Sequence, residues 1–98
     1  MPRLPVDFHP AAAEDAEAAV RWYHERSPQA ATAYLAEVTR AVRQVSEAPE
    51  QWPPYIEDTR RYIFRRFPFF LIYRVASNRI QVIAIAHAHR RPGFWRTR

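Results

Sequence analysis

The chain contains no lysine and no cysteine, and Gly93 is its single glycine. Without cysteine there is no disulfide framework, no thiolate nucleophile and no zinc site of the Cys type. With one glycine, a glycine-rich phosphate-binding loop is excluded. Because lysine is missing, all fifteen cationic side chains are arginines. Their planar guanidinium groups suit bidentate capture of phosphate or carboxylate.

Acidic residues are missing from the whole second part of the chain. All ten Asp and Glu residues lie before Arg60, together with five arginines, whereas residues 60–98 hold ten arginines and no acid. The formal charge is therefore −5 for the first part and +10 for the second. Charge segregated in this way indicates a partner that is rich in negative charge.

Long hydrophobic runs are missing as well. The N-terminal residues, M-P-R-L-P-V-D-F-H-P, contain no apolar signal sequence, and later apolar runs are well short of the ~20 residues that a membrane-spanning helix needs. We therefore expect a cytoplasmic protein that does not enter a membrane. With 48% hydrophobic and 14% aromatic residues, the chain is too apolar to be a disordered basic tail. Its length predicts a single domain over residues 1–98.

The first half of the chain predicts a short strand and two helices. Residues 4–8 form an extended stretch interrupted by proline, which suits an edge strand. Residues 10–26 show helical spacing of apolar residues after an initial proline. The Ser27-Pro28 pair is typical of a helix N-cap and first helical position, and it predicts a second helix that ends near Ala48. Because the link is so short, the two helices should form an antiparallel hairpin.

The second half of the chain predicts a sheet. Residues 49–59 carry too many prolines for regular structure and form the crossover. The hydrophobic period then changes to two, which predicts strands over residues 61–67, 69–75 and 79–87 with a turn at 76–78. The order is β-α-α-β-β-β. It defines an α+β fold in which the helical hairpin packs on one face of a small, mainly antiparallel sheet.

The same alternation assigns side chains to the two faces of the sheet. In the last strand, one face should carry Ile80, Val82, Ala84 and Ala86, and the other should carry Gln81, Ile83, Ile85 and His87. The residues expected to seal the helical hairpin against the sheet are Trp22, Tyr23, Tyr34 and Trp52. The face away from the helices should be open, and it belongs to the arginine-rich half.

The C-terminal motif H-A-H-R-R-P-G-F-W-R contains the side chains best suited to catalysis or ligand binding. His87 and His89 point the same way on a strand, but no third ligand is evident, so we predict no metal site and no cofactor. A neutral His87 or His89 could instead act as the base in RNA cleavage, with Arg66, Arg74 or Arg90 stabilising charge on the phosphorane. Alternatively, the arginines only bind phosphate or a carboxylate-bearing partner. Trp95 could stack on a nucleobase, or it could fold back as a lid on the core.

Two segments, R-R-Y-I-F-R-R-F-P-F-F-L-I-Y-R-V and I-A-I-A-H-A-H-R-R-P-G-F-W-R, resemble the RelE/ParE superfamily of toxins from type II toxin-antitoxin modules. The resemblance includes the β-α-α-β-β-β order and covers nearly the whole chain. It implies a small bacterial toxin that is neutralised by a cognate antitoxin. In that family an acidic and apolar C-terminal segment of the antitoxin wraps the toxin.

The resemblance implies two kinds of target. ParE-like members poison DNA gyrase without a recognised nuclease site, whereas RelE-like members cut mRNA in the ribosomal A site. The ending H-R-R-P-G-F-W-R is more similar to sequences grouped with ParE, and Trp95 stands roughly where RelE-like enzymes carry a catalytic tyrosine. We therefore expect gyrase inhibition ahead of ribosome-dependent mRNA cleavage. A non-toxic nucleic-acid-binding module is a third alternative.

The candidate site residues follow from these alternatives. If the protein is an enzyme, it is expected to be a metal-independent mRNA endoribonuclease with the catalytic residues His87, His89 and Arg66. The residues expected to bind the target or a nucleic acid are Arg65, Arg66, Arg74, Arg90, Arg91, Trp95 and Arg96. The expected partners are the cognate antitoxin and either DNA gyrase or the ribosome with its mRNA.

Overall fold

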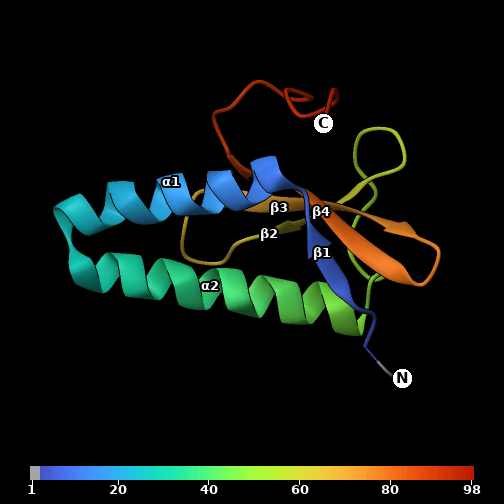
Figure 1. Cartoon of the computed structure of the whole chain (residues 1–98), viewed down its shortest axis with the longest axis horizontal. Coiled ribbons are helices and arrows are strands. Elements are labelled where there is room, and N and C mark those ends of the chain that lie inside the picture. Colours follow the sequence, from blue (N-terminus) through green and yellow to red (C-terminus); the bar gives the residue numbers. More distant parts are fainter. Residues whose placement is uncertain (1–2) are drawn as a thin grey trace.

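The computed structural model describes residues 3–98 and confirms the predicted order of elements. The elements are β1 (Val6–Phe8), α1 (Pro10–Arg26), α2 (Pro28–Glu47), β2 (Arg60–Ile63), β3 (Phe69–Ala76) and β4 (Arg79–His87). The sheet has the strand order β1-β4-β3-β2, in which β1 runs parallel to β4 and the other neighbours are antiparallel. The two helices lie side by side as a hairpin against the sheet (Figure 1).

Both helices begin with a side-chain cap followed by proline. The N–H of Ala11 donates to Nδ1 of His9 at 3.0 Å, and the N–H of Ala30 donates to the hydroxyl of Ser27 at 3.2 Å. Each cap satisfies a backbone donor that the first helical turn leaves unpaired. Ser27 is the only residue between the two helices, so the chain must reverse direction at once and form the hairpin.

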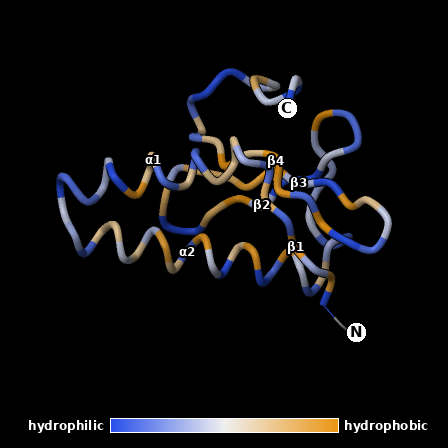
Figure 2. Tube along the Cα trace, in the orientation of Figure 1, coloured by the Kyte–Doolittle hydropathy of each residue, from blue (hydrophilic) through white to orange (hydrophobic). Residues whose placement is uncertain are grey.

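The hydrophobic core fills the space between the helical hairpin and the sheet. Its fully buried residues include Tyr34 and Val45 on α2, Leu71 and Tyr73 on β3, and Ile80 and Val82 on β4. Tyr23 and Trp52 pack against this core as predicted. Trp22 does not: it is 52% exposed, and the Arg26 guanidinium group lies over its ring at 3.7 Å. Figure 2 shows the apolar residues alternating with polar ones along each helix.

A β-bulge in β4 overturns part of the predicted assignment of faces. Tyr73 pairs with Val82 and Ile72 pairs with Ala84, so Ile83 has no partner on β3. The extra residue reverses the alternation that follows it. Ala84 therefore lies with Ile83 on the face away from the helices, and the prediction that it shares a face with Val82 was wrong. Ala86 moves to that face as well, and Ile85 joins the helix-side core.

The face away from the helices is covered, which contradicts the prediction of an open face. Ile72, Ile83, Ala84 and Ala86 are at most 2% exposed there and pack around Trp95. The C-terminal tail after β4 turns back across this face (Figure 1). Apolar residues on both faces require a cover on both faces, and here the tail supplies the second one. Neither helix in residues 3–98 is long and apolar enough to cross a membrane.

Candidate functional site

The loop between β2 and β3 and the segment after β4 meet at one end of the sheet. Phe69 at the start of β3 pairs with His87 at the end of β4. Beyond that pair, the N–H of Ala88 donates to the carbonyl oxygen of Pro68 at 2.8 Å. These contacts bring two predicted groups of residues to the same end of the molecule. We call it the basic end, and it consists of Arg65, Arg66, His87, His89, Arg90 and Arg91.

Two other predicted binding arginines are held by acids elsewhere. Nε of Arg74 lies 3.3 Å from the carboxylate of Asp58, and Nη2 of Arg96 lies 2.6 Å from the carboxylate of Glu57. Arg74 also sits toward the far end of β3 from the basic end. The structure therefore does not bring Arg74 into the basic end, and both arginines have part of their charge neutralised.

The arginines of the basic end carry no such partner. Within residues 3–98, no acidic side chain lies within ion-pair distance of Arg65, Arg66, Arg90 or Arg91. All four are exposed, and the Arg90 guanidinium group stacks over the ring of Phe94 at 3.8 Å. The free positive charge of the second half of the chain is thus concentrated where it can meet an anionic surface.

Glu37 of α2 positions the β2–β3 loop. Its two carboxylate oxygens accept hydrogen bonds from the backbone N–H groups of Arg65 and Arg66, each at 3.3 Å. Glu37 is only 4% exposed, so its charge is buried against the loop. The sequence reasoning missed this residue. Its spacing of three from Tyr34 and four from Ala41 places it on the buried stripe of α2, which could have revealed it.

The two histidines differ in whether a ring nitrogen is free to accept a proton. Their rings stack at 5.3 Å, and the N–H of His89 donates to Nδ1 of His87 at 3.1 Å. A neutral His87 ring must then carry its proton on Nε2, and its one free lone pair, on Nδ1, is engaged by the His89 N–H. This arrangement is unsuited to the predicted role of His87 as a base. No hydrogen bond within residues 3–98 occupies the ring nitrogens of His89.

Trp95 belongs to the core and not to the exposed site. It is 1% exposed and packs on Ile72, Ile83 and Ala84. The ring of Tyr55 lies 6.3 Å from it. The indole face therefore cannot stack on a target in this conformation. Trp95 instead covers the core as a lid, which was the alternative predicted from the sequence.

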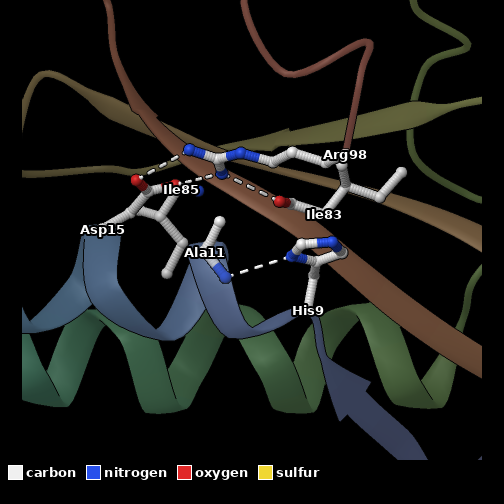
Figure 3. Close-up of polar contacts among 6 residues, drawn as sticks. All are labelled: His9, Ala11, Asp15, Ile83, Ile85 and Arg98. Atoms are coloured by element: carbon white, nitrogen blue, oxygen red, sulfur yellow. Dashed lines mark hydrogen bonds and ion pairs between the residues drawn. The ribbon is translucent and has the colours of Figure 1, made fainter.

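A buried ion pair attaches the tail to the start of α1 (Figure 3). Nη1 of Arg98 lies 2.7 Å from Oδ2 of Asp15 and donates to the carbonyl oxygen of Ile83 at 3.0 Å. The same carboxylate accepts the N–H of Ile85 at 3.1 Å. Because β1 ends at Phe8, this part of β4 has β3 on one side and no strand on the other. Asp15 and Arg98 satisfy backbone groups that would otherwise be orphaned at the edge.

In the folded protein, acidic side chains of the first part of the chain contact arginines of the second part. Within residues 3–98, four ion pairs join an early acid to a late arginine: Asp7 with Arg79, Asp15 with Arg98, Glu57 with Arg96, and Asp58 with Arg74. The first part therefore uses its acids to hold the second part in place. The positive charge that these ion pairs leave unneutralised includes the arginines of the basic end.

The helical hairpin packed on a mixed four-stranded sheet is a fold that also occurs in a solved toxin-antitoxin system. One solved structure with this fold is the chromosomal ParDE toxin-antitoxin system from P. aeruginosa, with a TM-score of 0.76 and 21% sequence identity. The similarity covers 87% of this chain and 96% of that chain. No curated protein sequence matches this chain.

The family follows from the sequence match itself. Residues 6–92 match the family described as the ParE toxin of the type II toxin-antitoxin system, parDE, and the chain therefore belongs to the ParE toxin family. The prediction of a ParE-like toxin component is confirmed. A toxin of this type has a cognate antitoxin as its partner.

Proposed function

We propose that the protein stops bacterial growth by binding DNA gyrase through its basic end. The observation that carries this proposal is the match to the ParE family over residues 6–92, which include all the helices and strands and all residues of the basic end. Gyrase holds DNA, so a surface near its bound DNA is rich in phosphate, and exposed arginines are suited to phosphate. Because gyrase acts on the chromosome, the proposed place of action is the cytoplasm.

The contacts at the basic end support binding ahead of RNA cleavage. Nδ1 of His87 is occupied by the N–H of His89, so a neutral His87 has no free lone pair. Trp95 is buried, and an indole can act neither as a base nor as an acid. The arginines, by contrast, are exposed and need no proton transfer in order to bind.

The test is a supercoiling assay with purified gyrase and relaxed plasmid, after induction of the protein in a bacterial host has been shown to stop growth. We expect the wild-type protein to block supercoiling or to leave linear plasmid. The double variants Arg65→Glu/Arg66→Glu and Arg90→Glu/Arg91→Glu should each weaken inhibition at least about tenfold, because each reverses charges at the contact. Arg21→Glu, on the exposed side of α1, is the matched control and should inhibit like the wild type.

Two results would contradict the proposal. One is normal growth of the host while the folded protein is present. The other is arrested growth with unimpaired supercoiling at every protein concentration. A charge-reversed double variant that inhibits gyrase as well as the Arg21→Glu control would exclude the basic end as the contact.

A ribosome-dependent mRNA endonuclease is the second candidate function. The observation that favours it is His89, whose ring nitrogens have no hydrogen-bond partner within residues 3–98. Arg90 and Arg91, which follow it closely in the chain, could stabilise a phosphorane. In that case primer extension on translated mRNA should show cuts in phase with the codons. His89→Ala should slow cleavage about 10²-fold or more, because a general base contributes at least that much. His87→Ala should have the smaller effect.

A further inference from the structure

A pocket lies between α1 and the edge of β4 that faces away from β3. We call it the α1–β4 pocket, and its volume is about 570 Å³. That volume falls within the range of about 300–1,000 Å³ that is typical of small-molecule sites. Both walls contribute to its lining, with Ala18, Ala19, Trp22 and Tyr23 from α1, and Ile85 and His87 from β4. Because His87 belongs to the basic end, the pocket is continuous with that cluster.

Side chains replace a neighbouring strand on the first part of the β4 edge. β1 pairs with β4 only as far as Val82. At the next step, Arg98 donates to the carbonyl oxygen of Ile83 (Figure 3). The carboxylate of Asp15 accepts from the N–H of Ile85, two residues later. A carbonyl and the N–H two residues after it are the two groups that one residue of a parallel strand would bond.

The following step along the same edge has no such partner. The Ile85 carbonyl points to the same side as the Ile85 N–H, away from β3. The N–H of His87 points there as well, because the next N–H, that of Ala88, donates in the opposite direction to Pro68. Within residues 3–98, no donor meets the Ile85 carbonyl and no acceptor meets the His87 N–H. The edge is closed again beyond them, since the Arg90 N–H donates to the His87 carbonyl oxygen at 2.9 Å. The pocket therefore offers one acceptor and one donor as neighbours.

Aromatic rings supply the surface on which a flat ligand can lie. Tyr23 and Phe69 both line the pocket, with ring centroids 6.4 Å apart. Trp22 meets Tyr23 edge to face at 5.1 Å and is 52% exposed, although the other side chains of its type are largely covered. Exposed aromatic rings of this kind stack on flat heterocycles.

The charges of the pocket favour an anionic ligand. Arg90 lines the pocket, and within residues 3–98 no acid lies within ion-pair distance of it. Its guanidinium group is held over the ring of Phe94 at 3.8 Å. Asp15 also lines the pocket, but its charge is paired with Arg98 at 2.7 Å. A guanidinium group fixed in this way suits a phosphate.

We propose that the α1–β4 pocket binds one unpaired nucleotide, with the Watson–Crick edge of its base on Ile85 and His87 and its phosphate on Arg90. Each nucleobase has a donor and an acceptor next to each other on that edge, and they match the Ile85 carbonyl and the His87 N–H. In a duplex these groups are already paired, so double-stranded nucleic acid does not fit. A peptide strand would pair with a longer row of backbone groups than the single step that is open here. The nucleotide is either free or part of a single strand, and the inference does not rest on gyrase inhibition.

The experiment titrates the full chain with adenosine monophosphate, with a single-stranded oligodeoxynucleotide of about 12 residues, and with the duplex of that oligonucleotide. Calorimetry measures the affinities at physiological salt. The duplex should bind at least about tenfold more weakly than the better of the other two probes, because its base edges are unavailable. A strand that binds more tightly than the monophosphate identifies nucleic acid as the source of the nucleotide. The reverse order identifies a free nucleotide.

Two variants test whether the ligand occupies this pocket. Ala18→Phe fills the pocket from an exposed position on α1 and should weaken binding of the better probe at least about tenfold. Ala36→Phe, the same change at an exposed position on α2, should stay within about threefold of the wild type. Arg90→Gln should weaken binding and lower the salt slope by about 1, because one phosphate contact is lost. Arg21→Gln removes the same charge from outside the pocket and should change neither quantity.

Hydrogen exchange tests the contact with the edge of β4. In the complex, exchange of the His87 amide should become at least about tenfold slower, because this amide acquires an acceptor. The Ile85 amide, which already donates to Asp15, is the internal control and should change less. Unchanged exchange at His87 would remove the base from this edge.

Three further results would overturn the proposal. The first is that neither the monophosphate nor the single strand binds. The second is a duplex that binds as tightly as the single strand, or inorganic phosphate that displaces the nucleotide at equal concentration, since either would show a plain anion site. The third is an Ala18→Phe variant that binds as well as the Ala36→Phe control. Loss of gyrase inhibition alone would contradict the proposed function and leave the nucleotide site unaffected.

Discussion

Arg98 in the tail lies against Asp15 in α1, with Nη1 and Oδ2 2.7 Å apart and both side chains less than one-fifth exposed. The two residues are 83 positions apart in the sequence. Together they close the unpaired edge of β4 at Ile83 and Ile85. One ion pair therefore holds three segments of the chain: the start of the hairpin, the central strand and the tail.

Loss of the Asp15 carboxylate should be strongly destabilising. Asp15→Ala leaves the Arg98 charge and the Ile85 N–H without a partner, and breaking a buried pair in this way costs about 3–5 kcal/mol. The exposed pair of Asp7 and Arg79 is the control, because its side chains are more than half exposed. Asp7→Ala should cost less than about 1 kcal/mol. Urea denaturation measures both, and equal costs would contradict the assignment.

Removal of the Glu37 charge should loosen the basic end without unfolding the protein. In Glu37→Gln the amide can accept one of the two loop N–H groups but carries no charge, and a hydrogen bond to a charged group contributes about 1.5–3 kcal/mol. Amide exchange at Arg65 and Arg66 should therefore accelerate, and growth inhibition should weaken at equal expression. Glu47→Gln, at the exposed end of the same helix, should change neither quantity. Unchanged exchange in Glu37→Gln would remove Glu37 from this role.

Removal of the Trp95 side chain should strongly destabilise the protein, because Trp95 is a core residue. Trp95→Ala should lower the free energy of unfolding by about 3–5 kcal/mol, because a buried aromatic side chain leaves a large cavity. Trp22→Ala removes the same side chain from a half-exposed position and should cost less than about 1 kcal/mol. Chemical denaturation compares the two. If the costs are similar, the tail does not cover the sheet in solution.

Alkaline pH should destabilise the protein through its buried tyrosines. Burial raises the pKa of Tyr73 to about 12 and raises the pKa of Tyr34 as well. Between the unfolded pKa near 10 and the folded pKa of Tyr73, the unfolded chain holds fewer protons than the folded one, so stability falls as pH rises. The Tyr73 hydroxyl also donates to the carbonyl oxygen of Pro49.

The matching variant is Tyr73→Phe, which cannot ionise. Its free energy of unfolding should be lower than that of the wild type at pH 7, because the Pro49 carbonyl loses its donor. Between pH about 10 and 12 its stability should fall less steeply than that of the wild type. Denaturation at a series of pH values tests this, and parallel curves for the two proteins would exclude Tyr73 as a contributor.

The local elements could be predicted because their signals are local. Pro10 and the Ser27-Pro28 pair mark the helix starts within a residue of where they are observed. The faces of β4 beyond Val82 could not be predicted, because the bulge arises from pairing with β3 and leaves no mark in the alternation. A strictly alternating pattern is followed only until a neighbouring strand requires an extra residue.

The candidate site could be predicted in part for the same reason. The arginines and histidines after β4 stand out by composition, and the meeting of that segment with Arg65 and Arg66 follows from an antiparallel pair. Glu37 and Asp15 could not be assigned as partners, because contacts between distant parts of the chain depend on the packed fold. Arg96 was predicted to bind the target, but Glu57 forms an ion pair with it, and Asp15 does the same with Arg98.

The position of β4 between β1 and β3 has a consequence for synthesis of the toxin. A nascent chain that ends before Arg79 has both helices but lacks the strand on which β1 and β3 converge. β2 and β3 can pair, but β1 then has no neighbour and the core lacks Ile80, Val82 and Ile85. Contacts between distant segments form slowly even in the finished chain. The toxin can therefore complete its core, and bring the two halves of the basic end together, only after almost all of it has been translated.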